Sequence, residues 1–270
     1  MSAVITLGFS PCPNDTFIFG AMVHGFVDTE GLEFDYRMED VETLNHLAMK
    51  NVPDMVKVSY HAFLYLSPLY RLLDSGSALG FGNGPLLISK KKYSIADLDD
   101  LIIAIPGEYT TAHLLLKLIA PGIKRTKILV FNEIEDALLQ DEADAGVIIH
   151  ENRFTYERKG LLKIADLGEA YESLTNSPVP LGGIIAKKSL GTEILDKLNR
   201  IMRRSVEFAM KNPDAVMDFV RNNAQEMEDA VIQKHINLYV NSFTVDLGIE
   251  GRKAIARLFE LAHERGLIHK

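Results

Sequence analysis

The sequence predicts an α/β protein with two lobes, and three observations support this prediction. Short apolar runs typical of strands alternate with helical patterns along the chain as far as Ala186. From Leu190 onward the pattern is helical almost to the end. A chain of 270 residues with 47% hydrophobic side chains is long enough to build a core in each lobe. We therefore expect mixed, mostly parallel sheets followed by a helical C-terminal return.

The first lobe begins with a strand that runs directly into a stiff polar turn. Residues 4–9 are apolar and predict the strand, and residues 10–15 read Ser-Pro-Cys-Pro-Asn-Asp. The two prolines fix φ and remove two backbone donors, and Asn14 or Asp15 is expected to cap a helix over 15–24. Open α/β sheets bind ligands at such strand-to-helix turns, and the amides of a helix start suit anionic groups.

The remaining elements place a second lobe inside the first. In the first lobe the pattern predicts further strands at 32–38, 54–59 and 85–89 and helices at 40–49 and 62–70. In the second lobe it predicts strands at 102–107, 127–131 and 145–150, helices at 95–101, from 110 and at 134–140, and a return strand at 181–186. The helical tail breaks near 212–213 and 245–251. We expect residues 1–90 plus 187–270 to form lobe 1 and 91–186 to form lobe 2, with a ligand cleft between them.

Composition excludes several classes of protein. The formal net charge of −8 argues against a nucleic acid partner, which needs a basic surface. The single cysteine, Cys12, excludes an internal disulfide and is expected to be a packing residue, and the eight histidines lack metal-ligand spacing, so no metal site is predicted. The N-terminus has neither the basic nor the apolar region of a signal peptide, and no run approaches the roughly 18 apolar residues of a membrane span. A cytoplasmic protein is expected.

Polar side chains follow the predicted strands in both lobes and are the candidate binding residues. Lys57 and Ser59 share one side of a strand by its period of two, although a lysine there is ordinarily a solvated charge. Threonines 110 and 111 begin a helix, where they suit a carboxylate but equally suit ordinary capping. The full set is Ser10, Asn14, Asp15, Lys57, Val58, Ser59, Thr110, Thr111, His150 and Arg153.

His150 is the candidate base. An imidazole titrates near neutral pH and can accept a proton from a substrate. The simpler alternative is a histidine that ends the sheet and bonds a carbonyl group, which is the commoner role. Arg153, Phe154 and Tyr156 follow it and suit an aromatic carboxylate, although Arg153 could equally form a surface ion pair.

Four segments together resemble the 1,4-dihydroxy-6-naphthoate synthase family of the futalosine route to menaquinone. They are residues 10–17 (SPCPNDTF), 57–59 (KVS), 107–112 (GEYTTA) and 150–156 (HENRFTY). The resemblance covers most of the chain, and the first and last segments are its most specific parts. Asn152 departs from the glycine that the family often has after its histidine pair, which leaves the course of that loop open.

The resemblance implies a fold, a reaction and roles for residues. The fold is the two-lobe type 2 periplasmic-binding-protein fold. The reaction is a lyase conversion of cyclic dehypoxanthine futalosine to 1,4-dihydroxy-6-naphthoate, without metal or organic cofactor. The substrate is an aromatic carboxylate that carries a sugar-derived ring. His150 would be the proton acceptor, and Lys57, Val58, Ser59, Thr110 and Thr111 would bind the substrate.

Three other functions stay open at this point. A solute-binding protein for a small carboxylate would share the fold and lack the chemistry. Chorismate dehydratase, a sister enzyme of the same pathway, is less consistent with residues 10–15 and the His150 segment. A ligand-sensing regulatory domain would need a DNA-binding segment that the pattern does not predict. The apolar faces of the tail, such as Leu258-Phe259, suit packing on lobe 1 or on a second copy, so a homodimer also stays open.

Overall fold

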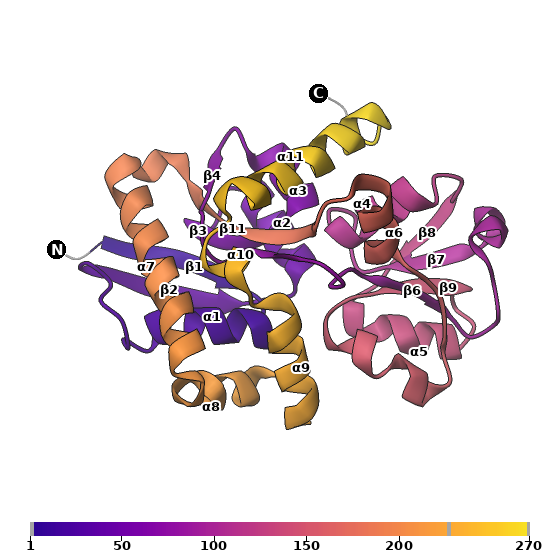
Figure 1. Ribbon diagram of the computed structural model, residues 1–270, viewed down its shortest axis with the longest axis horizontal. Coiled ribbons are helices and arrows are strands. Elements are labelled where there is room, and N and C mark those ends of the chain that lie inside the picture. The colour runs from indigo at the N-terminus through magenta and orange to yellow at the C-terminus, as the bar shows by residue number, and fades with distance from the viewer. Residues whose placement is uncertain (1–2, 226–227, 269–270) are drawn as a thin grey trace. The chain divides into compact units, whose positions relative to one another are not determined.

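The computed structural model describes residues 3–225 and 228–268 (Figure 1). It separates into two compact units, each described here by itself. Unit 1 contains the chain up to Leu79 together with Gly182–Arg252, and unit 2 contains Gly80–Leu181 together with the chain from Lys253. The last helix, α11 (Gly248–Glu264), crosses this boundary. The residues after Arg252 therefore group with unit 2, whereas the sequence analysis assigned the whole tail to lobe 1.

Unit 1 is built on a mixed sheet with strand order β2-β1-β3-β11-β4, in which β5 also pairs with β11. The strands are β1 (Ala3–Phe9), β2 (Leu32–Met38), β3 (Met55–Ser59), β4 (Tyr70–Leu72), β5 (Ala78–Gly80) and β11 (Val179–Lys187). β1 pairs in parallel with β2 and β3, whereas β11 runs antiparallel to β3 and β4. The parallel pairing brings the carboxyl ends of β1 and β3 to one edge of the sheet.

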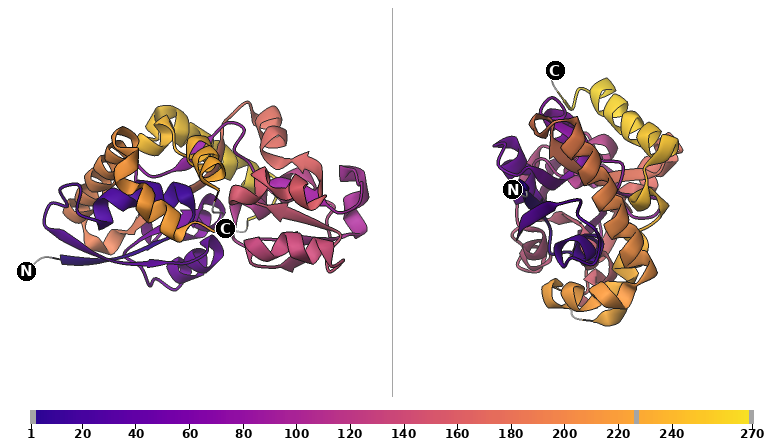
Figure 2. Two further views of the ribbon diagram at one scale, coloured as in Figure 1. Left: turned by 90° about the horizontal axis from the view of Figure 1, so that it is seen from below. Right: turned by 90° about the vertical axis from the view of Figure 1, so that its left-hand side faces the viewer.

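Helices cover both faces of this sheet. They are α1 (Pro13–Val23), α2 (Val41–Met49), α3 (Tyr60–Leu66), α7 (Thr192–Lys211), α8 (Pro213–Asn223), α9 (Asp229–Tyr239) and α10 (Ser242–Val245). α1 packs against α7, α8 and α9 (Figures 1 and 2). Alternate β1 residues Ile5, Leu7 and Phe9 join the core with these helices. Gly8 points to the other face, where a Cβ would lie 2.9 Å from Leu44 of α2.

Unit 2 has its own mixed sheet, with strand order β10-β6-β9-β7-β8. Its strands are β6 (Leu86–Ser89), β7 (Ile102–Ile105), β8 (Arg125–Ile128), β9 (Ala145–Ile148) and β10 (Leu162–Asp166). Its helices are α4 (Thr111–Ile119), α5 (Ile134–Leu139), α6 (Leu167–Thr175) and the end of α11, with short 3-10 turns at Ile95–Asp100, Phe131–Glu133, His150–Phe154 and Tyr156–Lys159. β7 pairs in parallel with β8 and β9, and β6 runs antiparallel to β9 and β10.

The predicted α/β fold with mixed sheets and a helical return is confirmed, and two local predictions are corrected. α1 begins at Pro13, and Cys12 occupies its N-cap position in place of Asn14 or Asp15. Proline favours the first position of a helix, where its missing N–H costs nothing. β9 ends at Ile148, so His150 lies on a 3-10 turn after the strand. No helix in the described part of the chain is long and apolar enough to cross a membrane.

Candidate functional site

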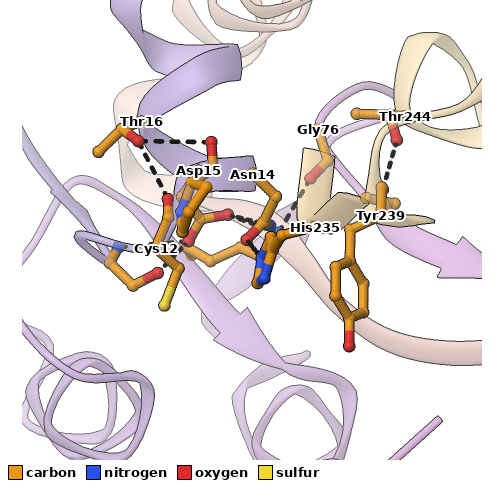
Figure 3. Close-up of polar contacts among 12 residues, drawn as sticks. Cys12, Asn14, Asp15, Thr16, Gly76, His235, Tyr239 and Thr244 are labelled. Atoms are coloured by element: carbon orange, nitrogen blue, oxygen red, sulfur yellow. Dashed lines mark hydrogen bonds and ion pairs between the residues drawn. The ribbon is translucent and has the colours of Figure 1, made fainter. Parts of the chain in front are cut away.

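The predicted turn after β1 forms a buried polar cluster in unit 1 (Figure 3). Asp15, in the first turn of α1, points back to Ser10 at the end of β1. The amide and hydroxyl of Ser10 donate to Asp15 Oδ2 over 3.2 and 2.7 Å. Asn14 Nδ2 donates to Asp15 Oδ1 over 2.9 Å. The rigid Pro11-Cys12-Pro13 stretch thus places the start of α1 next to the end of β1, and the Asp15 carboxylate connects the two through hydrogen bonds.

Lys57 completes this cluster from the neighbouring strand. β3 lies beside β1, with Val56 opposite Gly8, so Lys57 is next to the turn that follows β1. Its Nζ lies 3.2 Å from Asp15 Oδ1 and donates to the carbonyl oxygen of Gly76 over 3.2 Å. Lys57 is only 5% exposed and Asp15 only 2%. A buried charge is tolerated when it is paired and hydrogen-bonded, and each of these charges has both.

Gly76 supplies the second hydrogen-bond acceptor for Lys57, and a residue with a side chain at this position would destabilise the fold. Its φ of 92° lies in the left-handed region, and a Cβ there would lie 2.4 Å from Ile184 Cγ1. Its amide donates to the carbonyl oxygen of Thr244 over 2.8 Å. The backbone around Gly76 is therefore fixed from two directions, and its carbonyl group is held toward Lys57.

His235 of α9 joins the cluster from far along the chain. The side chain is 0% exposed, and its Nε2 lies 2.9 Å from Asn14 Oδ1. Its ring lies against Tyr239, with 4.6 Å between the ring centroids. α9 therefore contacts the turn after β1, where ligand binding was predicted. The sequence pattern did not predict this contact with α9.

Val58 and Ser59 continue β3 beyond Lys57. Val58 is 0% exposed and pairs with Gly183 of β11. The Ser59 amide donates to Asn45 Oδ1 over 2.9 Å, and Asn45 Nδ2 lies 3.3 Å from Ser59 Oγ. Asn45, from α2, thereby fixes both the backbone and the hydroxyl oxygen of Ser59.

In unit 2, Thr110 and Thr111 begin α4 as predicted. Thr110 is the N-cap: its hydroxyl oxygen accepts from the His113 amide over 3.2 Å, and its hydroxyl donates to Gly107 O over 2.8 Å. The Thr111 hydroxyl donates to Leu181 O over 2.6 Å. Capping, the simpler alternative for Thr110, therefore does occur.

His113, in the first turn of α4, lines a cavity that none of the predicted site residues line. Its Nδ1 lies 2.9 Å from Glu108 O. Burial lowers the pKa of the His113 imidazole, which favours its neutral form at pH 7. The cavity measures about 420 Å³, and its lining includes Lys117 and Lys124.

His150 has an unusual backbone. Its φ is 60°, in the left-handed region that few residues other than glycine adopt. The ring packs edge-on against Phe131, with 5.0 Å between the ring centroids. Strained residues of this kind cluster at functional sites, where the surrounding structure holds them.

Arg153 lies on the same 3-10 turn as His150 and anchors it. The guanidinium lies 3.1 Å from Asp166 Oδ2 and also donates to the carbonyl oxygen of Gly84. The other oxygen of Asp166 caps α6, accepting from the amides of Gly168 and Glu169 over 2.9 and 3.0 Å. Arg153 therefore connects the turn that carries His150 to the start of α6.

The structure brings the predicted residues together only in part. Ser10, Asn14, Asp15 and Lys57 form one connected cluster in unit 1. In unit 2, Thr110 and Thr111 belong to α4, whereas His150 and Arg153 belong to a separate turn. Sequence reasoning missed four supporting residues, namely Asn45, Gly76, Asp166 and His235. Of these, Asp166 carried a usable signal, because an Asp followed three residues later by Glu169 is a pattern typical of a helix start.

Comparison with known proteins matches nearly the whole chain. A family model described as menaquinone biosynthesis matches residues 5–264. A protein of Thermus thermophilus named 1,4-dihydroxy-6-naphtoate synthase is 44% identical, over 97% of this chain and 95% of its own length. A protein of Streptomyces coelicolor with the same name is 42% identical, over 99% of this chain and 96% of its own.

Solved structures agree with the fold. A crystal structure of a protein from Archaeoglobus fulgidus has a TM-score of 0.93 at 35% identity and covers 98% of both chains. A Candida albicans protein described as having the generic periplasmic binding protein fold has a TM-score of 0.72 at 12% identity, covering 99% of this chain and 91% of its own. The predicted periplasmic-binding-protein fold is therefore confirmed.

Proposed function

Because this chain belongs to the menaquinone-biosynthesis family whose model matches residues 5–264, we propose that it is a 1,4-dihydroxy-6-naphthoate synthase. The proposed substrate is cyclic dehypoxanthine futalosine, and the reaction is that of a lyase acting in the cytoplasm. The names of the relatives at 44% and 42% identity support this activity over its sister reaction on chorismate.

His150 is the proposed general base. The supporting observation is its left-handed backbone, with φ of 60°, on a turn anchored by Arg153. Strain of this kind costs on the order of 1–3 kcal/mol and persists where the surroundings enforce it. We therefore assign the strain to the need to aim the imidazole at a substrate.

The proposed reaction starts with removal of a proton. His150 would take a proton from the carbon next to the ketone carbonyl of the substrate, which leaves an enolate. The electron pair of the enolate would then break one bond to the sugar-derived ring, and the protonated His150 would return its proton to the departing group. Cleavage of the second bond to that ring would release the fragment and complete the aromatic naphthoate. Donors near the carbonyl oxygen would stabilise its developing charge.

The substrate-binding residues in unit 2 are proposed to act through α4. The hydroxyl hydrogens of Thr110 and Thr111 are donated to carbonyl groups. These residues would therefore hold a carboxylate or oxyanion chiefly through the backbone amides of the first helical turn, which is the usual anion site of a helix. Arg153 was expected to meet the substrate directly. Its contacts with Asp166 and Gly84 support a second role, holding the turn of His150.

In unit 1, the proposed substrate-binding stretch is Lys57, Val58 and Ser59, with Ser10, Asn14 and Asp15 beside it. Lys57 has three ammonium hydrogens, and the described residues supply two acceptors for them, Asp15 and Gly76. The remaining hydrogen would serve a carbonyl or carboxylate oxygen of the substrate. Val58 is fully buried, so its part would be to hold Lys57 and Ser59, on either side of it, in place.

The decisive experiment is product analysis. Purified protein is incubated with cyclic dehypoxanthine futalosine, and in parallel with chorismate, and the products are identified by mass spectrometry. We expect 1,4-dihydroxy-6-naphthoate from the first substrate only. A new product from chorismate would replace the assignment by chorismate dehydratase, and recovery of both compounds unchanged would favour a binding protein.

The base is tested with His150→Ala and His150→Gln. Both should lower kcat by roughly 10²–10⁴-fold, the usual contribution of a general base. Lys163→Gln, on the exposed part of β10, serves as the control and should retain wild-type turnover. Near-wild-type turnover by His150→Ala would remove His150 as the essential base.

A further inference from the structure

We propose that the segment from His235 to Thr244, which covers the end of α9 and α10, is the positioning element for Lys57. It acts on the two groups that hold the Lys57 ammonium, one through Asn14 and Asp15 and the other through Gly76 (Figure 3). This inference rests on the proposed function only in that Lys57 is taken to contact the substrate. We call the set Asn14, Asp15, Lys57, Gly76, His235 and Thr244 the lysine brace.

The first arm of the lysine brace fixes the orientation of an amide. Asp15 is acceptor-only when ionised, so the group of Asn14 that faces it over 2.9 Å must be the NH₂ donor. The amide oxygen of Asn14 then faces His235 Nε2 over 2.9 Å. Two acceptors would repel each other, so Nε2 of His235 carries the hydrogen and donates it to Asn14. This assignment follows from the donor and acceptor inventory alone.

The hydrogen bond from His235 therefore has an effect at Asp15. Without it, the Asn14 amide would be held from one side only, by its hydrogen bond to Asp15 Oδ1, and would be free to turn away from the carboxylate. Turning away would remove a hydrogen bond that holds Asp15 Oδ1 in place. Asp15 Oδ1 is also the oxygen that lies 3.2 Å from Lys57 Nζ. The position of the ammonium thus depends on a histidine that does not touch it.

The second arm fixes the other acceptor of Lys57. The carbonyl oxygen of Thr244 accepts from the Gly76 amide over 2.8 Å, and the Thr244 hydroxyl lies 3.2 Å from the carbonyl oxygen of Tyr239. The ring of Tyr239 in turn lies tilted against the ring of His235. The two arms therefore meet in one short segment, which braces Lys57 from both sides.

The test separates positioning from simple stability. His235→Leu removes the Nε2 donor at similar volume, and His235→Gln returns an amide N–H near the position of Nε2. Ser205→Ala is the matched control, because Ser205 is also 0% exposed and bonds α1 at Ile18 and Met22, away from the lysine brace. All three variants should cost stability in unit 1.

We expect only His235→Leu to raise KM, by roughly 10-fold, with kcat within about 3-fold of wild type, because weakened binding alone raises KM. His235→Gln should restore KM to within about 2-fold. Ser205→Ala should lower the amount of folded protein and leave KM unchanged. Equal KM values for His235→Leu and wild type would overturn the proposal, as would an equal rise in Ser205→Ala.

A second readout needs no substrate. The ammonium resonance of Lys57 is followed by ¹H–¹⁵N NMR, with Lys57→Met used for assignment. It should broaden or shift in His235→Leu, return in His235→Gln and stay unchanged in Ser205→Ala. If wild-type protein does not convert the proposed substrate, the proposed function fails while this readout still decides the lysine brace. If His235→Leu does not fold, His235→Asn, whose amide is too short to reach the Nε2 position, takes its place, and an unchanged Lys57 resonance there would overturn the inference.

Discussion

The two units place a buried ion pair beside their candidate residues, but they use it differently. In unit 1 the pair is Asp15 and Lys57, both predicted site residues, with side chains 3% and 7% exposed. In unit 2 the pair is Arg153 and Asp166, which connects the turn of His150 to a helix start. The ion pair of unit 1 is therefore part of the proposed site. The ion pair of unit 2 instead holds the turn that carries the proposed base.

This difference indicates a division of labour between the units. The charges of unit 1 are neutralised internally and held by groups from α1, α9 and the Gly76 backbone, which suits fixed recognition of a substrate. In unit 2 the proposed base is a single histidine with a left-handed backbone, and the ion pair connects its turn to the start of α6. Substitutions at the Asp15–Lys57 pair should therefore change stability and binding, and those at the Arg153–Asp166 pair should change turnover.

The largest expected effect on stability is that of Lys57→Met. It leaves the Asp15 carboxylate buried without its cation, and breaking a buried pair costs about 3–5 kcal/mol. Urea unfolding is followed by circular dichroism, because the chain has no tryptophan for fluorescence. The double variant Asp15→Leu/Lys57→Met should recover much of the loss while KM stays raised. A loss below about 1 kcal/mol for Lys57→Met would contradict the paired role of these charges.

Gly76→Ala should have the next largest effect, about 1–3 kcal/mol from the positive φ and a further cost from the contact with Ile184. Gly160→Ala in unit 2 is the matched control, because its φ of 75° is similar and no atom lies within 4 Å of a Cβ there. The difference between the two variants in urea midpoint measures the packing cost alone. Equal losses would mean that the backbone near Gly76 relaxes freely.

Arg153→Leu tests the ion pair of unit 2. The pair is less buried than that of unit 1, with side chains 13% and 3% exposed, so we expect a smaller loss of about 1–3 kcal/mol. Because the turn of His150 loses its anchor, kcat should fall by roughly 10-fold with little change in KM. Steady-state kinetics check this split. A rise in KM alone would instead support direct contact between Arg153 and the substrate.

The smallest effect concerns Glu30, which contacts Arg200 and Arg204 of α7. Hydrogen bonds from Arg200 lower the pKa of the Glu30 carboxyl from 4.5 to about 2. A lowered pKa stabilises the folded state fully above about pH 4.5, and this contribution is lost as the pH falls toward 2. Glu30→Gln should therefore cost about 0.5–1 kcal/mol at pH 7 and nothing near pH 2, as measured by urea unfolding at both pH values. An equal loss at both would contradict the ionic role.

Much of the fold could be predicted because its signals are local. The strand at residues 32–38 was predicted with its observed ends, since apolar residues alternate with Glu33, Asp35 and Arg37, which is the period of a strand. β10 and α6 were missed because β10 is a short edge strand with Leu162 and Lys163 both exposed, and its register shifts after Lys163, so no strand period is visible.

The residues proposed to contact the substrate could be predicted from the sequence, whereas the residues that hold them in place could not. Ser10, Asn14, Asp15 and Lys57 follow strands, and parallel strands bring such residues to one edge. The contact of Asn14 with His235 joins positions 221 residues apart, and no local rule connects them. The start of α1 was placed two residues late, because Asp15 uses its carboxylate across the turn and not for its own helix.

The strand orders of the two sheets have a consequence for synthesis of the chain. Every strand of the unit 2 sheet lies between Leu86 and Asp166, whereas the unit 1 sheet needs β11 between β3 and β4. As the chain leaves the ribosome, β1, β2 and β3 emerge early, but β3 keeps an unpaired edge until Gly182 is made. An open strand edge is a template for pairing with another chain. The nascent protein is therefore most exposed to misassembly while its inserted unit is being translated, and slower translation there should increase aggregation.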